Sequence, residues 1–381
     1  MIVLVIAGAV GIVTLIVQKY AYSLLTSQQQ AREEHQQRVQ SLREEGAVRD
    51  GAAPGAASSN RTTSPTKVIL MHSFPYWYNL KSGPLAFASC DYPCTLTLDA
   101  ELMEEVDSVV IYSHHFSPQV QPLGNPDQIW VYFSVESPFH SDNDIFAKPE
   151  WHHRFNWTMT YRRDSDFYFG YGDFVKPSSP IPHRDFSSLV AGKSKMVAWF
   201  VSNCNTQSKR EEFAAALKDF IQVDIYGQCG DLKCGKGGNQ TCLDMLSRDY
   251  YFYLAFENSL CKDYLTEKLY HTMKVVDIIP VVRGGADYAT LLPQNSFIDV
   301  SQFPSIKALA DYLRQVAGDR KVYESYLAWK NEWRVIEPIP FSFCEFCQRL
   351  HHPKRWARVY PNVDSWWREG ACHEPPFVVK S

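Results

Sequence analysis

The sequence has little net charge and no concentration of basic residues. Its 381 residues include 38 Lys and Arg against 42 Asp and Glu, which gives a formal net charge of -4. Proteins that bind nucleic acids neutralise phosphates with clustered lysines and arginines, and no such stripe is visible here. The composition therefore argues against a nucleic-acid partner.

Motifs that bind common cofactors and metals are also missing. Neither GxGxxG nor GxxxxGK[ST] follows a predicted strand, so the sequence signals neither a dinucleotide nor an ATP P-loop. Cys344-x-x-Cys347 has no second CxxC to complete a zinc site. The histidine pairs that begin at 114, 152 and 351 are adjacent residues rather than i,i+4 pairs, and we do not interpret them as metal ligands.

Long uncharged runs are absent except at the start of the chain. The run from Ile2 to Val17 carries no charge and ends before Lys19. It is short for an average bilayer but fits a thinner early-secretory membrane. No small-x-small cleavage site follows closely, so we predict a signal anchor over 1–20, with a cleaved signal peptide as the alternative. No Lys or Arg precedes the run, so flanking charge leaves the orientation open.

Residues 21–66 predict a stem rather than a folded domain. Residues 28–45 are rich in Gln, Glu and Arg and lack apolar heptads, which favours a solvated helix or loose stalk. Residues 46–66 are rich in Gly, Ala, Ser, Thr and Pro, a composition typical of a flexible linker. The folded part is expected to begin near Lys67.

Cysteines and aromatic residues are plentiful. Ten cysteines behind a membrane anchor predict disulfides formed in the secretory pathway. Their connectivity stays open, although four of them surround one segment and are expected to staple its loops: Cys229, Cys234, Cys242 and Cys261. Three sequons, at Asn60, Asn156 and Asn239, are candidate glycosylation sites in the same compartment.

The remaining chain predicts two α/β domains. In the first, 67–185, the segments 67–71, 109–112 and 129–135 have strand composition, and 101–106 is compatible with a helix. The third strand leads into Glu136-Ser137-Pro138, which places a carboxylate at its carboxyl end. The Pro- and Ser-rich segment 176–182 is the predicted connection to the next domain.

The second domain, 186–335, contains two successive β-α-β units. The first has strands at 196–201 and 223–226 around a helix at 210–220, and the second has strands at 251–256 and 278–282. The intervening helix is expected to start near Tyr264, capped by Asp263 or Ser259. Glu267 and Lys268 then lie in its first turns, where backbone N–H groups and an ammonium attract the same anion. The tail, 336–381, is expected to pack back on the first domain, held by cysteines.

The stretch that begins at Phe252, FYLAFENSLCKDYLTEKLY, and the later segments IPVVRGG and LPQNSFIDVSQF resemble the signature of the α1,3-fucosyltransferases, glycosyltransferase family 10. The resemblance includes Glu136 and Arg162 and covers most of the chain beyond residue 66. It implies a GT-B architecture, with two Rossmann-like domains facing a cleft. It also implies a type II Golgi membrane enzyme with a lumenal catalytic domain, and invertebrate members are the most similar.

The resemblance implies inverting transfer of fucose from GDP-fucose to O3 of N-acetylglucosamine in a glycan, with no metal and no further cofactor. Glu136 matches the base, while Arg210 and Lys268 match the cations that hold the diphosphate. Four other positions match the donor pocket: Ser202, Asn258, Tyr264 and Glu267. Arg283 departs from the pattern, because family members usually have an aliphatic residue there.

Several alternatives stay open. Asp142-Asn143-Asp144 and Asp164-Ser165-Asp166 both read D-x-D, a short pattern that can hold Mn²⁺ or Mg²⁺ in a metal-dependent GT-A enzyme. A catalytically silent glycan-binding protein is another class, against which intact Glu136, Arg210 and Lys268 argue. The acceptor is either an N-glycan core or a lactosamine antenna.

Overall fold

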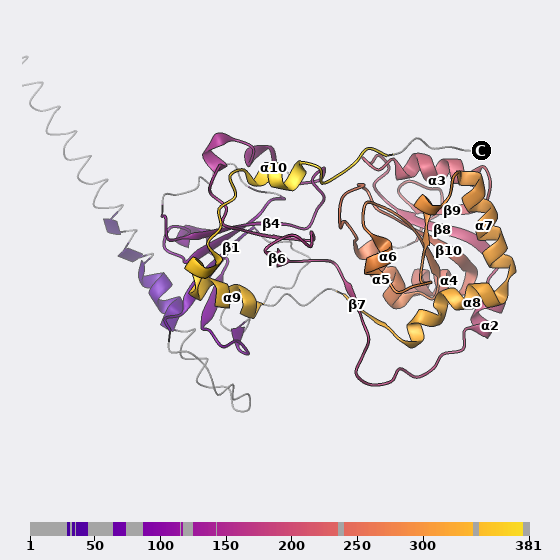
Figure 1. Cartoon of the computed structure of the whole chain (residues 1–381), viewed down its shortest axis with the longest axis horizontal. Helices are drawn as coiled ribbons and strands as arrows, with labels where there is room; N and C mark the ends of the chain where they lie inside the picture. Colours follow the sequence, from indigo (N-terminus) through magenta and orange to yellow (C-terminus); the bar gives the residue numbers. More distant parts are fainter. Residues whose placement is uncertain are drawn as a thin grey trace, which may run out of the picture. The chain divides into compact units, whose positions relative to one another are not determined.

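The computed structural model describes residues 29–30, 33–34, 36–44, 64–73, 87–114, 116, 125–141, 143–234, 240–337 and 343–375 (Figure 1). The predicted anchor at 1–20, most of the predicted linker at 46–66, Asp142 and the sequon positions Asn60 and Asn239 lie outside these ranges. Within them, no helix is both long and apolar enough to cross a membrane.

The chain forms two compact units. The first comprises residues 1–131, 154–156 and 342–359, and the second comprises 132–153, 157–341 and 360–381. The predicted boundaries at 66, 185 and 335 stay predictions.

The first unit is built on short parallel strands. β1 (Lys67–His72) pairs in parallel with β2 (Cys94–Thr97) on one side and β3 (Ser108–Tyr112) on the other. The predicted strands at 67–71 and 109–112 are confirmed, whereas the four-residue β2 escaped the sequence analysis.

The helix predicted at 101–106 is wrong. Only the 3-10 helix η2 (Ala100–Leu102) forms, followed by a turn. The side chain of buried Gln128 donates to the carbonyl oxygens of Met103 and Val106, at 2.7 and 2.9 Å. These two carbonyls are therefore paired by a side chain from outside the segment, a substitute for helical hydrogen bonds.

Two disulfides join α9 (Phe343–His351) to the segment around β2 in the same unit. They are Cys90–Cys344 and Cys94–Cys347. Both cysteines of the CxxC motif are thus disulfide-bonded. Residues 36–44 of the predicted stalk are helical, with Val39 buried and Arg43 paired to Asp107 at 3.0 Å.

The strands β1 to β3 belong to a six-stranded sheet of order β2-β1-β3-β4-β5-β6. Its other members are β4 (Ile129–Ser134), β5 (Trp157–Thr160) and β6 (Phe167–Tyr168). The predicted strand at 129–135 is confirmed, and the chain leaves β4 immediately before Glu136.

The second sheet is entirely parallel. Its order is β12 (Ile298–Asp299), β11 (Ile279–Arg283), β10 (Tyr250–Phe256), β8 (Lys195–Val201) and β9 (Val223–Gly227). The four longer strands confirm the predicted strands at 196–201, 223–226, 251–256 and 278–282. A separate antiparallel pair joins β7 (Asp173–Val175) to β13 (Arg334–Ile336).

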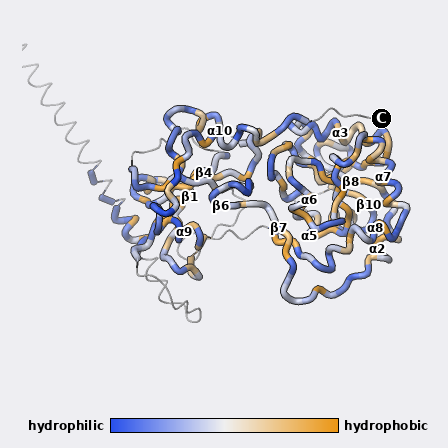
Figure 2. The backbone as a smooth tube through the Cα atoms, in the orientation of Figure 1, coloured by the Kyte–Doolittle hydropathy of each residue, from blue (hydrophilic) through white to orange (hydrophobic). Residues whose placement is uncertain are grey.

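Helices cover both faces of this sheet (Figure 1). One face packs against α2 (Ser187–Gly192), α3 (Arg210–Lys218), α7 (Ile306–Gly318) and α8 (Arg320–Leu327). The other packs against α4 (Gln240–Asp249), α5 (Glu267–Val275) and α6 (Tyr288–Leu291). Figure 2 shows hydrophobic segments at the central strands and hydrophilic ones on the helices, as expected for a doubly covered sheet.

Two short helices complete the chain. They are η6 (Ala328–Asn331) and α10 (Val363–Arg368), the latter near the C-terminus. Two parallel sheets with flanking helices agree with the predicted α/β class.

Candidate active site

Three neighbouring strands of the second sheet end at one edge. Ser202 follows β8, Glu257 and Asn258 follow β10, and Arg283 closes β11. Because these strands are parallel and adjacent, their carboxyl ends share an edge of the sheet, where α/β proteins bind ligands.

Glu257 is the buried centre of this edge. Its side chain is fully inaccessible, and its Oε1 accepts hydrogen bonds from the backbone N–H and the hydroxyl of Thr266, at 2.8 and 3.0 Å. Burial raises the pKa of Glu257, and the nearby ammonium of Lys268 opposes that rise. A buried carboxylate requires such partners.

Lys268 lies beside this carboxylate at the start of α5. Its Nζ is 3.4 Å from Glu257 Oε2 and 3.2 Å from Glu267 Oε1, and it donates to the Thr266 hydroxyl at 2.9 Å. Burial alone would lower the pKa of Lys268, but the two carboxylates outweigh burial and raise it. The side chain keeps 24% exposure, so a charged ammonium faces the helix N-terminus and solvent.

Arg210 is the first residue of α3 and is buried. Its Nη1 donates to the carbonyl of Phe256 at 2.7 Å, and its Nη2 donates to the carbonyl of Asn203 at 3.3 Å. Nε is buried without a hydrogen-bond partner among the described residues. Burial lowers the pKa of Arg210, and Glu257 opposes that effect. Arg210 and Lys268 thus both lie close enough to Glu257 to feel its charge.

Glu136 belongs to the same unit and contacts the loop between β10 and α5. Its Oε2 accepts a hydrogen bond from the hydroxyl of Tyr264 at 3.2 Å. The neighbouring hydroxyls of Ser137 and Ser259 are 2.7 Å apart and both buried. These contacts bring the predicted base to the loop that leads to Lys268.

Tyr264 is held in an aromatic cluster. It is 1% exposed, and its ring lies 4.8 Å from that of Tyr161 and 6.5 Å from that of Tyr171. Burial raises the pKa of Tyr264, so its hydroxyl stays protonated and can donate to Glu136.

The other predicted donor-pocket residues lie near the same edge. Ser202 is exposed directly after β8, and Glu267 is exposed at the first position of α5. Asn258 Oδ1 accepts from the Ser259 hydroxyl at 3.2 Å, and its carbonyl accepts from the N–H of Ser208 at 3.1 Å. All seven predicted catalytic and donor residues therefore lie within the second unit.

The helix start was predicted incorrectly. α5 begins at Glu267 with Thr266 as its N-cap, rather than near Tyr264 with Asp263 or Ser259 as the cap. Asp263 has a left-handed backbone (φ 60°), and its carboxylate accepts from the N–H of Arg163. Sequence reasoning also missed Glu257, which was assigned only to a turn. An acidic residue directly after an apolar strand, nine residues before a threonine cap, is the signal that could have found it.

The acidic residues of the second D-x-D motif already have protein partners. Asp164 pairs with Arg162 at 2.7 Å and Lys262 at 3.2 Å, and Asp166 Oδ2 accepts from the N–H of Thr158 at 2.9 Å. In the first motif, Asp144 lies 3.4 Å from Arg368.

Arg283 joins the end of β11 to the segment before α3. It is 6% exposed, donates from Nη1 to the Ser208 carbonyl at 2.6 Å and lies over the ring of Phe213 at 5.2 Å. Burial lowers the pKa of Arg283 to about 10. The unusual arginine therefore packs behind the predicted site.

The sequon at Asn156 is engaged in backbone hydrogen bonds. Its Oδ1 accepts from the N–H of Trp130 at 2.8 Å, and its Nδ2 donates to the Arg358 carbonyl at 3.3 Å. A glycan on Nδ2 would have to displace the second bond, so this position argues against modification. Glycosylation at Asn60, Asn156 and Asn239 stays a prediction.

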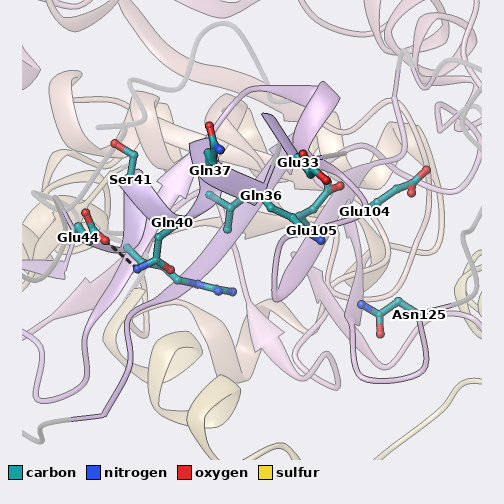
Figure 3. A pocket seen from close by; sticks show the side chains of 11 residues that line it. Glu33, Gln36, Gln37, Gln40, Ser41, Glu44, Glu104, Glu105 and Asn125 are labelled. Carbon is teal, nitrogen blue, oxygen red and sulfur yellow. Dashed lines mark hydrogen bonds between the residues drawn. The ribbon is translucent and has the colours of Figure 1, made fainter. Parts of the chain in front are cut away.

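A polar hollow in the first unit contains none of the predicted catalytic or donor residues (Figure 3). Its lining comes from the helical segment at 33–44 together with Glu104, Glu105 and Asn125. Glutamine and glutamate dominate the lining, and no aromatic residue is present to stack on a sugar or a base.

Comparison with known proteins identifies the family. Residues 64–172 match the profile described as "Fucosyltransferase, N-terminal", and residues 190–366 match "Glycosyltransferase family 10 (fucosyltransferase) C-term". The chain is 34% identical over 340 residues to "3-galactosyl-N-acetylglucosaminide 4-alpha-L-fucosyltransferase FUT3" of Bos taurus, with 84% of this chain and 87% of that relative covered. The chain belongs to glycosyltransferase family 10.

Two Drosophila melanogaster relatives match more strongly over part of their length. "Alpha-(1,3)-fucosyltransferase C" is 39% identical over 289 residues, covering 70% of this chain and 66% of the relative. "Glycoprotein 3-alpha-L-fucosyltransferase A" is 34% identical, covering 82% of this chain and 62% of the relative. The chain thus spans slightly less than two thirds of either one.

A solved structure titled "Crystal Structure of alpha1,3-Fucosyltransferase" aligns with 86% of this chain and 97% of that chain, at 17% identity and a TM-score of 0.49. The family membership and the GT-B-like α/β fold agree with the prediction from the sequence.

Proposed function

We propose that this chain transfers fucose from GDP-fucose to O3 of an N-acetylglucosamine residue in a glycan, with inversion at the anomeric carbon. The carrying observation is that one unit holds Arg210 and Lys268 around buried Glu257, with Glu136 joined to the same loop through Tyr264. Membership of glycosyltransferase family 10 and the names of the relatives support the donor and the linkage.

Glu136 acts as the general base in this proposal. The acceptor O3 attacks C1 of the donor fucose, the bond from C1 to the diphosphate oxygen breaks, and the O3 proton passes to the Glu136 carboxylate. Attack opposite the leaving group converts the β-linked donor into an α-linked product. Tyr264 donates to Oε2, which leaves Oε1 of Glu136 as the oxygen for the acceptor proton.

Arg210 and Lys268 stabilise the departing GDP. Each lies at the first turn of a nine-residue helix, so backbone N–H groups add to their charge at the position of the diphosphate. Cations that are already held in place cost little reorganisation when negative charge develops on the leaving group.

No divalent ion is needed in this mechanism. Arg210 and Lys268 supply positive charge, and the carboxylates of Asp164 and Asp166 accept hydrogen bonds or ion pairs from protein groups. We also assign the chain to the Golgi lumen behind a type II anchor. All ten cysteines form five disulfides, which supports an oxidising compartment.

The deciding experiment is Glu136→Gln. Glutamine keeps the size and the acceptor for Tyr264 but cannot take the proton, so turnover should fall about 10²- to 10⁴-fold. GDP affinity by calorimetry and the melting temperature should hardly change. Glu150→Gln, at an exposed position of the same unit, is the matched control and should retain turnover.

The assay supplies GDP-fucose with either an N-glycan core glycopeptide or lactosamine, and mass spectrometry identifies the product and its linkage. Near-normal turnover by Glu136→Gln would remove Glu136 as the base. GDP-fucose binding without transfer to any acceptor by the wild type would support the silent glycan-binding alternative.

A further inference from the structure

The final described residues of the chain contact the loop that carries the candidate donor site. Cys372 forms a disulfide with Cys261, four residues after Glu257. The N–H of Lys262 donates to the Ala371 carbonyl at 2.7 Å, and the N–H of His373 donates to the Leu260 carbonyl at 3.0 Å. A covalent bond and two backbone hydrogen bonds therefore fasten the tail to the loop in antiparallel pairing.

The same tail also contacts the segment before α3. Gln207 Nε2 donates to the His373 carbonyl at 2.9 Å, while Gln207 Oε1 accepts from the N–H of Leu260 at 3.0 Å. One side chain thus joins three segments: the tail, the loop before α5 that leads to Lys268, and the segment that leads to Arg210.

Further anchoring holds the start of the tail in place within this unit. Trp367 is fully buried and donates from Nε1 to the Ser141 hydroxyl at 2.9 Å, and Arg162 donates to the Trp366 carbonyl at 2.7 Å. The ring of Trp367 lies 5.4 Å from that of Tyr161, which in turn packs against Tyr264. The tail is therefore fixed at both ends of residues 366–373.

The loop has little freedom on its opposite side. A Cβ added at Gly285 would lie 2.6 Å from the carbonyl carbon of Cys261, so the backbone after β11 packs directly beneath the disulfide. The loop is held between this glycine and the tail, and a change in either should shift Asn258 and Tyr264.

We propose that residues 366–373 are a positioning element for the donor site, with the Cys261–Cys372 disulfide as its covalent fastening. Cys372 lies beyond residue 366, where the match to the family profile ends. The inference rests on the proposed function for its consequence on nucleotide binding. A loop that is only partly populated in its binding conformation weakens apparent affinity by that fraction.

The test compares the double variant Cys261→Ser with Cys372→Ser to a matched double variant of the Cys234–Cys242 disulfide in the same unit. Releasing the tail should raise the Kd of GDP about five- to tenfold, and the KM for GDP-fucose in parallel, with kcat changed less. The matched variant should lose thermal stability but keep the wild-type Kd. Unchanged GDP affinity in a folded Cys261–Cys372 double variant would overturn the proposal.

Two further measurements keep the inference separable from the proposed function. Hydrogen exchange of the amides at 257–266, without nucleotide, should be faster in the Cys261–Cys372 variant than in the matched variant; equal exchange would also overturn it. If the double variant does not fold, Gln207→Ala leaves the disulfide intact and should still raise the Kd of GDP about threefold. A wild type that fails to bind GDP would refute the proposed function, while the exchange measurement would still decide the role of the tail.

Discussion

At the scale of residues, the site depends on charges that are buried close to one another. Glu257 has no exposure, and it is stable as a carboxylate because Thr266 and Lys268 satisfy it. A buried charge that loses its partner is costly, so these residues are expected to respond to substitution as a group.

Lys268→Ala should weaken GDP binding. Loss of one ion–phosphate contact costs about 1.5–3 kcal/mol, which corresponds to a roughly 10- to 150-fold higher Kd. Lys274→Ala, in the last turn of the same helix and exposed, should bind GDP as the wild type does. Calorimetry measures both, and an unchanged Kd in folded Lys268→Ala would exclude this lysine from the site.

Glu257→Gln should alter the pH dependence of GDP binding. Burial lowers the pKa of Lys268 and the carboxylates raise it more strongly, so the wild-type ammonium persists below that elevated pKa and is lost only as the pH rises through it. Without the charge of Glu257, the loss of affinity should begin at lower pH. Titrations with GDP from about pH 7 to about pH 10 test this, with exposed Glu332→Gln as the control. Superimposable pH curves for the wild type and Glu257→Gln would show that Glu257 has no electrostatic effect on the lysine.

At the scale of elements, the N-termini of α3 and α5 decide where an anion can bind. Both helices begin at the carboxyl edge of the parallel sheet, and each brings one cation to it. The position of the first helical residue therefore matters more than the helix length.

Thr266→Ala should affect both stability and nucleotide binding. The threonine hydroxyl caps α5 and accepts from Lys268 Nζ, so its loss should cost about 1 kcal/mol of unfolding free energy and weaken GDP binding. Ser305→Ala removes the comparable cap of α7 and should lower stability similarly without changing the Kd of GDP. Denaturant unfolding and calorimetry on the pair separate the two effects, and equal Kd values would leave Thr266 with a capping role alone.

At the scale of the whole molecule, two parallel sheets and five disulfides define the framework. Two disulfides lie in the first unit and three in the second, so each unit is cross-linked internally. Reducing conditions should therefore destabilise both units.

Fucose transfer should survive removal of divalent ions. Two protein cations neutralise the departing diphosphate in the proposed mechanism, so a metal contributes nothing essential to the chemical step. Activity is measured after extensive EDTA treatment and gel filtration, with and without added Mn²⁺. Complete loss that Mn²⁺ restores would favour the D-x-D alternative.

The sequence by itself determined the class of the fold and the identity of the predicted site residues. Apolar runs such as 251–256 are strands wherever they are packed, because their composition suits a buried parallel sheet. The motif around Glu267 and Lys268 indicated the family directly. Local signals of this kind survive folding, since they depend on neighbours in the chain.

Only the tertiary structure decided the partners of these residues. The cap at Thr266, the burial of Glu257 beside Lys268 and the contact between Tyr264 and Glu136 join segments up to 128 positions apart. The pairing of Cys261 with Cys372, across 111 positions, was equally unreadable. Such contacts depend on how the strands and loops pack, and no local pattern in the sequence specifies them.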